Sequence, residues 1–169
     1  NGAYLEVTGT DFEGNSQEGI YFEQQYASYL IEDCSFVGGN YGIRHDNNYN
    51  QNNRIIKNCE FQGANSTAIY FDRNSDYEWG GQIYNCSIHD NGAGIENPRS
   101  VTNSIIYGNN GWGINGYTTN SYTSVNNSTI VNNLYGVVDC NIVNSIIYFN
   151  SNTQSQTSTI SYSNVQGGI

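Results

Sequence analysis

Three carboxylates, those of Glu23, Asp46 and Asp72, each stand three residues after an isoleucine that follows a glycine or an alanine. If these segments repeat one structural unit, the carboxylates align about 5 Å apart and repel unless a cation or the nearby Arg44 and Arg73 offset them. Flexible sets of oxygen atoms are the ligands that Ca²⁺ prefers. The pattern therefore predicts a candidate Ca²⁺ site at this acidic column, and a solvated acidic edge is the alternative.

The residues two positions before these carboxylates belong to a second column, which we expect on the outer surface. The column contains Tyr21, Arg44, Tyr70, Glu96, Asn115 and Val138. The polar segments nearby hold further aromatic residues, expected in loops, namely Tyr26, Tyr29, Tyr49, Tyr77 and Trp79. Aromatic rings with polar rims suit the flat faces of sugars. The pattern therefore predicts carbohydrate binding by Tyr21, Arg44, Tyr70, Tyr49, Tyr77 and Trp79. The alternative is that the loop rings only cover the flank of the fold.

Arg44, in this outer column, is followed by a histidine. Its neighbour His45 falls in an inward column between Phe22 and Phe71. A histidine packed between phenylalanines is favoured as a hydrogen-bonded core residue over a catalytic base.

The cysteines favour buried thiols over disulfides. Cys34, Cys59 and Cys86 occupy a position that serine or threonine fills in other copies of the repeat. Parallel side chains on stacked strands are also poorly aimed for bridging. Cys140 stands apart from this column, and its state stays open. A zinc site is disfavoured, because no close cysteine pair occurs and the two histidines are far apart in sequence.

A motif of six residues recurs along the whole chain, in the order apolar, any, Asn or Asp, small, any, apolar. Its clear copies are 31–36, 56–61, 83–88, 101–106, 125–130 and 142–147, and its weaker copies are 7–12 and 160–165. A second motif, Asn followed by Gly-Ile or a close variant, comes after most copies, from 15–20 to 132–137. Asn, Asp and Gly accept a left-handed backbone at little steric cost, so both motifs predict bends.

Each period thus predicts one coil of three short strands separated by bends, and the copies predict about eight stacked coils. Stacking pairs every strand with its counterparts in the neighbouring coils, so equivalent side chains form columns. The motif directs Ile31, Cys34 and Phe36 inward. The expected fold is an all-β, right-handed parallel β-helix (solenoid), a single domain over residues 1–169 with no capping helix.

On these motifs, and on the closing segment 160–168, the chain resembles the right-handed parallel β-helix (pectate-lyase-like) superfamily and its secreted bacterial β-helix repeat proteins. The resemblance implies an extracellular or cell-surface location. It also implies an enzymatic alternative, in which the chain is a fragment of a Ca²⁺-dependent polysaccharide lyase with Arg44 in the position of its base. Polygalacturonase-like members need paired aspartates, a Gly-His-Gly motif and an Arg-Ile-Lys motif. The first two are absent here, and Arg54–Lys57 carries an extra isoleucine, so hydrolysis by two carboxylates has no support.

Charge and length limit the possible partners. A net charge of −10 with five Lys and Arg residues would repel a nucleic-acid backbone. No apolar stretch approaches the roughly 20 residues that cross a bilayer, so we expect no membrane insertion. The expected function is a structural or adhesive extracellular module, part of a longer protein, that binds a polysaccharide or cell-surface glycan. Its end coils are expected to meet further coils of the same chain or a second copy, end to end.

Overall fold

The computed structural model describes residues 4–23, 28–46, 53–72, 80–117 and 123–166, in which every regular element is a β-strand. The strands form three parallel sheets. Sheet A contains, in order, β1 (Tyr4–Thr8), β4 (Ser28–Glu32), β7 (Arg54–Lys57), β10 (Gln82–Tyr84), β13 (Ser100–Thr102), β16 (Thr123–Asn126), β19 (Cys140–Val143) and β22 (Thr159–Ser161). Sheet B contains β2 (Asp11–Glu13), β5 (Ser35–Val37), β8 (Glu60–Gln62), β11 (Ser87–His89), β14 (Ile105–Tyr107), β17 (Thr129–Val131), β20 (Ile146–Tyr148) and β23 (Asn164–Val165). Sheet C contains β3 (Glu18–Phe22), β6 (Tyr41–His45), β9 (Thr67–Phe71), β12 (Ala93–Glu96), β15 (Trp112–Asn115), β18 (Tyr135–Val138) and β21 (Thr153–Gln156).

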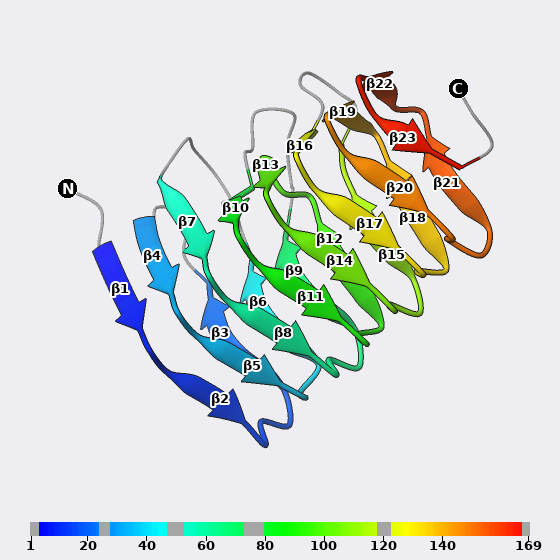
Figure 1. Cartoon of the computed structure of the whole chain (residues 1–169). Helices are drawn as coiled ribbons and strands as arrows, with labels where there is room; N and C mark the ends of the chain where they lie inside the picture. The colour runs from blue at the N-terminus through cyan, green and yellow to red at the C-terminus, as the bar shows by residue number, and fades with distance from the viewer. Residues whose placement is uncertain (1–3, 24–27, 47–52, 73–79, 118–122, 167–169) are drawn as a thin grey trace.

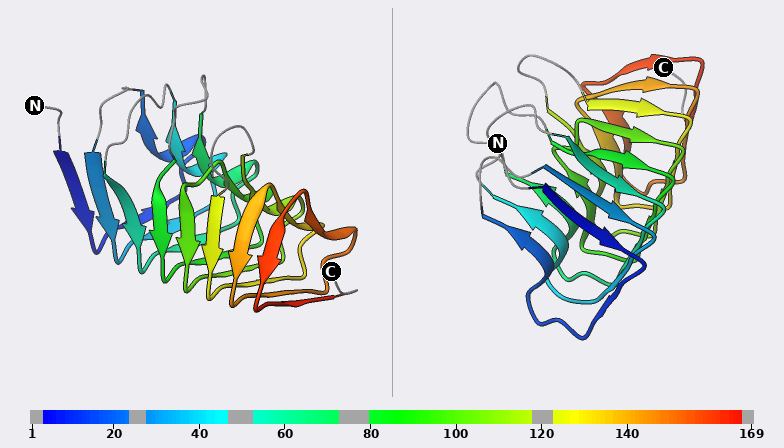
Figure 2. Two further views of the ribbon diagram at one scale, coloured as in Figure 1. Left: turned by 90° about the horizontal axis from the view of Figure 1, so that it is seen from above. Right: turned by 90° about the vertical axis from the view of Figure 1, so that its left-hand side faces the viewer.

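Each of the first seven coils takes one strand from each sheet, in the order A, B, C, and β22 and β23 follow as an eighth pair. In Figure 1 the chain runs downward through β1 and β2 at the front, returns upward through β3 behind them and advances to the right. This path makes a right-handed parallel β-helix, as predicted. Figure 2 shows the coils stacked along one axis, with the first and last coils at opposite ends. Within the described ranges, no helix is long and apolar enough to span a membrane.

The bend between sheets A and B is made by the Asn or Asp of the repeated motif, as predicted. All six of these residues have a positive φ, between 49° and 55°: Asp33, Asn58, Asn85, Asn103, Asn127 and Asn144. Their short polar side chains tolerate this left-handed conformation. In the two end coils Gly9 and Tyr162 take the same conformation. One backbone geometry therefore explains why the motif repeats.

The small residue after each bend lines the interior, also as predicted. Cys34, Cys59 and Cys86 are each 3% exposed, and the serines that replace them in later coils are at most 2% exposed: Ser104, Ser128 and Ser145. The hydroxyl of Ser104 accepts a hydrogen bond from the backbone N–H of Cys86 at 3.2 Å, and the same bond recurs in each later coil as far as Ser163. All four cysteines, Cys140 included, are buried free thiols.

A second interior column, which sequence reasoning did not predict, is a ladder of asparagine amides. Its members are at most 5% exposed: Asn91, Asn109, Asn133 and Asn150. Each Nδ2 donates to the Oδ1 of the next member at 2.8–3.1 Å, and each backbone N–H donates to that same oxygen. Each Nδ2 also donates to a backbone carbonyl of the coil before. The ladder begins at the backbone N–H of Ala64 and ends at Oε1 of Gln154.

Aromatic rings fill the core of the first coils. Phe12, Phe36 and Phe61 stack with successive ring centroids 4.6 Å apart and planes within 1°. Gly42 passes so close to this stack that a Cβ there would lie 2.6 Å from Phe61 Cδ1, which explains the glycine. Aliphatic residues continue the column in the later coils, namely Ile88, Ile106, Ile130, Ile147 and Val165.

Two residues are more buried than predicted. Tyr29, expected in a loop, belongs to β4, is 1% exposed and stacks on Phe22 at 4.3 Å, because it shares the inward side of its strand with Ile31. Val138 keeps the predicted register but is only 9% exposed, because its short side chain lies between the longer Asn115 and Gln156 of the neighbouring coils. The outer column of sheet C therefore presents no exposed side chain at Val138.

Candidate functional site

The predicted outer column lies on sheet C, in the predicted register. Tyr21 pairs with Arg44, Arg44 pairs with Tyr70, and Tyr70 pairs with Glu96. Tyr21 is 48% exposed, and the other three are half-buried. Adjacent strands of a sheet are about 4.8 Å apart. The sheet therefore holds an aromatic ring, a cation, a second ring and a carboxylate in one evenly spaced line.

Arg44 lies at the centre of this face. Its Nη2 and Nε donate to the two carboxylate oxygens of Asp46 at 2.8 and 2.9 Å, and its Nη1 donates to Glu18 Oε1 at 3.4 Å. The guanidinium also lies over the rings of Tyr21 and Tyr41, 5.6 and 5.3 Å from their centroids. The Tyr21 hydroxyl in turn donates to Asp46 Oδ2 at 3.1 Å. Paired bonds to one carboxylate, together with two ring faces, hold the arginine and both rings in fixed positions.

The same contacts set the protonation states on this face. Hydrogen bonding to Asp46 raises the pKa of the Arg44 guanidinium, although burial acts in the opposite direction. Burial, and then the charges of Asp72 and Glu96, raise the pKa of Tyr70 to about 12, so its hydroxyl stays protonated. An arginine held in its charged form supports a role in binding over the removal of a proton.

Three further aromatic residues of sheet C were not predicted as site residues: Tyr41, Trp112 and Tyr135. Each directly precedes the glycine of the second motif. Gly42 and the isoleucine after it are both buried, so the alternation is interrupted and the residue before the glycine faces outward. The Tyr41 ring packs against Tyr70 with centroids 5.7 Å apart, and Trp112 stacks on Tyr135 at 4.4 Å. An aromatic residue directly before Gly-Ile or Gly-Val was the available signal.

The predicted acidic column continues past the ends of these strands. Backbone hydrogen bonds from Asp46 to β3 and from Asp72 to β6 extend the ladder by one residue and keep both in line with Glu23. Asp46 is held by the arginine described above, and Asp72 Oδ1 lies 3.4 Å from the hydroxyl of Tyr70. Within the described residues, no group of three or more His, Cys, Asp or Glu side chains could hold a metal ion. Calcium binding here stays a prediction.

Of the predicted loop aromatics, only Tyr29 belongs to the described part of the chain, and it lies in the core. Tyr49, Tyr77 and Trp79 lie outside the described residues, as do Tyr26 and Arg73. The site is therefore built from strand residues. His45, directly beside Arg44 in sequence, is fully buried between Phe22 and Phe71, in the inward position that was predicted for it.

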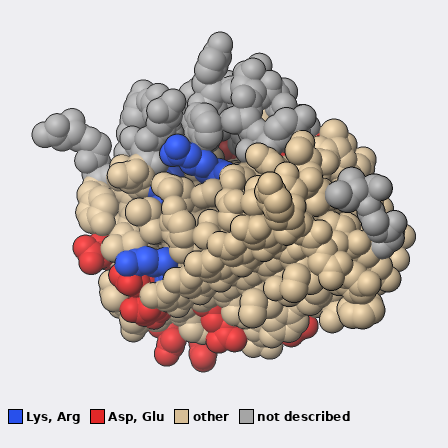
Figure 3. Space-filling view, turned by 45° about the horizontal axis from the view of Figure 1, so that its top comes forward, with Lys and Arg blue, Asp and Glu red and all other residues tan. Residues whose placement is uncertain are grey.

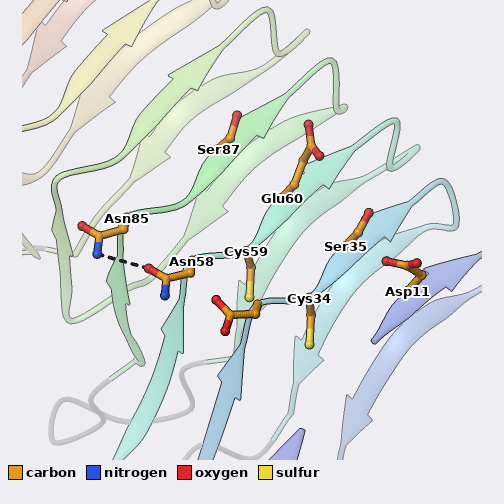
Figure 4. A pocket seen from close by; sticks show the side chains of 9 residues that line it. Asp11, Cys34, Ser35, Asn58, Cys59, Glu60, Asn85 and Ser87 are labelled. Carbon is orange, nitrogen blue, oxygen red and sulfur yellow. Dashed lines mark hydrogen bonds between the residues drawn. The ribbon is translucent and has the colours of Figure 1, made fainter. Parts of the chain in front are cut away.

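An open groove of about 530 Å³ runs along the corner between sheets A and B (Figure 4). Nine residues line it: Asp11, Asp33, Cys34, Ser35, Asn58, Cys59, Glu60, Asn85 and Ser87. Figure 4 shows the side chains of Ser35, Glu60 and Ser87 directed away from the two sulfur atoms, which belong to the buried column. None of these nine lining residues is aromatic, so the groove offers polar contacts and no ring faces.

His89 on β11 lies beside this groove and joins two coils. Its Nε2 is 3.1 Å from Glu60 Oε1, its Nδ1 is 2.9 Å from Asp90 Oδ2, and its ring stacks on Tyr107 at 4.7 Å. Burial lowers the pKa of His89, but the hydrogen bonds and charges of Asp90 and Glu60 raise it by more, so the net shift is upward from 6.5. Both ring nitrogens face carboxylates, which favours the imidazolium form.

We expect the contact between His89 and its two carboxylates to make stability depend on pH. A folded-state pKa above the unfolded value adds stability that is fully present below about pH 6.5 and is lost as the pH rises through the folded-state pKa. The midpoint of thermal unfolding of the parent protein, relative to that of His89→Gln, should therefore fall as the pH rises. A constant difference between the two proteins from pH 5 to pH 9 would contradict this expectation.

Comparisons of the chain with known protein families, with curated proteins and with solved structures find no match.

Proposed function

We propose that the chain is an extracellular β-helix repeat module with a structural or adhesive role, and that it binds carbohydrate on sheet C. The observation that carries the proposal is the tyrosine face, which we define as Tyr21, Tyr41, Arg44 and Tyr70. These side chains contact one another on the outer surface of the sheet. Ring faces with hydroxyl rims suit sugars, and rings already fixed in place lose little freedom on binding.

The structural part of the proposal rests on the edges of the sheets. Within the described residues, β1, β2 and β3 pair on one side only, with β4, β5 and β6. Strand edges of this kind can template the addition of further strands. We propose that further coils of the same chain, or a second copy stacked end to end, pair with them. Membership of the pectate-lyase-like superfamily and the cell-surface or extracellular location belong to the same proposal, and they rest on the repeated motifs.

The enzymatic alternative, a Ca²⁺-dependent polysaccharide lyase, has less support. A lyase base must accept a proton, whereas Arg44 donates to Asp46 and Glu18, and its pKa is raised by the first of these contacts. The carboxylate of Asp46 is also engaged by this arginine, which leaves fewer oxygen atoms for a cation.

A binding experiment with matched tyrosine variants tests the carbohydrate proposal. Binding to a panel of polysaccharides is measured by affinity electrophoresis for the parent protein, Tyr70→Ala and Tyr84→Ala. Removing one stacking ring should cost about 1 kcal/mol, roughly a fivefold loss of affinity. Tyr84 is the control, because it is half-buried on the outer face of sheet A, where its hydroxyl donates to Gln82 at 2.7 Å. Equal binding by all three proteins, or no binding to any polysaccharide, would contradict the proposal.

A further inference from the structure

We infer that the ligand of the tyrosine face is an uncharged polysaccharide rather than an acidic one. This inference rests on the proposed function, because it names the class of carbohydrate that the same surface would accept. An acidic polysaccharide carries carboxylates or sulfates, which proteins bind through open arginine or lysine donors. The charges around the tyrosine face disfavour such a ligand, because the cation is paired within the protein and carboxylates are in excess.

The cation of this face is already neutralised within the protein. Both oxygens of Asp46 accept hydrogen bonds from Arg44, and Glu18 accepts a third. The carboxylates of Glu18 and Asp46 are only 19% and 17% exposed, so they cannot swing freely away from the arginine. A carboxylate of a ligand would have to displace Asp46 to reach the same donors. The paired geometry of the guanidinium with Asp46 makes that exchange unfavourable.

Carboxylates also outnumber cations on this sheet. The outer face carries Glu18 on β3 and Glu96 on β12, with Asp46 and Asp72 directly after β6 and β9. Against these four acids, Arg44 is the only Lys or Arg among the described residues of the strands of sheet C and the positions directly after them. Burial raises the pKa of Glu96, and a hydrogen bond from Thr67 lowers it. An acidic polymer along this face would therefore meet repulsion at several coils.

The other Lys and Arg residues in the described part of the chain lie outside sheet C. Arg54 is 1% exposed inside the rod, Lys57 pairs with Glu32 on sheet A at 2.8 Å, and Arg99 directly precedes β13 of sheet A. The sequence 73–79 adds Arg73 but also two acids. No described part of sheet C therefore presents a cation other than Arg44.

The face continues into an almost uncharged region. Residues 100–169 contain one charged residue, Asp139, and this region includes the stacked pair of Trp112 and Tyr135. On the side of the molecule that Figure 3 shows, which is not the outer face of sheet C, coloured atoms also gather toward the N-terminal coils. A long uncharged polymer could follow the sheet from the tyrosine face, past Glu96 on β12, onto this pair, because it carries no charge for the carboxylates to repel.

The carboxylates have a positive role toward uncharged sugars. Carboxylate oxygens accept strong hydrogen bonds from hydroxyl groups, and two carboxylates neighbour Tyr70: Asp72, two residues after it, and Glu96, its partner on β12. Rings that stack on a sugar, beside acceptors for its hydroxyl groups, make a suitable site for a polyhydroxylated and uncharged ligand.

The test uses pairs of polysaccharides that share a backbone and differ in charge. Hydroxyethyl cellulose is compared with carboxymethyl cellulose, and fully methyl-esterified polygalacturonate is compared with polygalacturonate, at low and at high salt. We expect the acidic member of a bound pair to bind about tenfold more weakly at low salt, and the gap to narrow at high salt as repulsion is screened. Equal or tighter binding of the acidic members would overturn the inference and leave the proposed function standing. Binding to none of the polymers would instead remove the proposed function.

A charge variant locates the source of the preference. Asp46→Asn should free the Arg44 donors and reduce the discrimination against the acidic polymers about fivefold or more. Glu13→Gln is the control, because it removes the same charge from an exposed position on sheet B. An equal change in both variants would show that net charge, rather than the arrangement on sheet C, selects the ligand, and would overturn the inference.

Discussion

Replacing Phe36 by alanine is expected to lower the free energy of unfolding by about 3–5 kcal/mol. The ring is 2% exposed and lies between Phe12 and Phe61, with both centroids 4.6 Å away. Its removal exposes two ring faces to a cavity that the stacked coils cannot close, because each coil is fixed by its neighbours. The measurement is chemical unfolding followed by circular dichroism.

Phe149→Ala is the matched control for this variant. Phe149 is 63% exposed, so the same truncation should change stability by no more than about 0.5 kcal/mol. Similar losses for Phe36→Ala and Phe149→Ala would show that the stacked rings do not form a core.

Asn109→Leu is expected to destabilise the protein by about 3 kcal/mol or more. The amide of Asn109 accepts two bonds from Asn91 and donates to Asn133 Oδ1 and to the Ile88 carbonyl, and the residue is 2% exposed. Leucine has a similar size but leaves the buried N–H groups of Asn91 and the carbonyl of Ile88 without these partners. A buried polar group without a partner costs more free energy than one hydrogen bond contributes. The loss of stability should therefore exceed the loss that a cavity alone would cause.

The neighbouring residue supplies the control for Asn109. Asn110 is exposed, and its backbone N–H bonds to the Asn91 carbonyl, which Asn110→Leu leaves intact. The midpoint of thermal unfolding should fall by about 10 °C for Asn109→Leu and change little for Asn110→Leu. Equal midpoints for the two variants would mean that the amide ladder contributes no stability.

Most of the fold could be predicted from the sequence, because one backbone requirement repeats. The left-handed bends at Asp33, Asn58 and their equivalents demand Asn, Asp or Gly, and the following position must be small because it is buried. Residue identity alone could not reveal the buried amide ladder, since asparagine forms both the exposed bends and the ladder in this part of the repeat. Asn132 is an exposed left-handed bend, whereas Asn133, the next residue, is a buried member of the ladder. Only the path of the chain separates the two roles.

The candidate site was predicted in part, for a related reason. Regular alternation along the strand placed Tyr21, Arg44 and Tyr70 outward. The same rule failed for Tyr41, because Gly42 and the next residue both face inward and shift the alternation by one. The paired bonds between Arg44 and Asp46 could not be predicted, because Asp46 follows the end of β6 and strand alternation does not fix the direction of its side chain.

The amide ladder gives the interior of the rod an electrical direction. The side-chain oxygens of Asn109, Asn133 and Asn150 each accept a bond from the ladder amide of the coil before, so the Asn91, Asn109 and Asn133 amides each donate to the coil after. The amide dipoles therefore add along the axis, and each bond polarises the next. A row of dipoles of this kind can be lengthened only by coils that point the same way. A coil inserted in the opposite orientation would bring oxygen against oxygen or hydrogen against hydrogen, so the core itself distinguishes one end of the rod from the other.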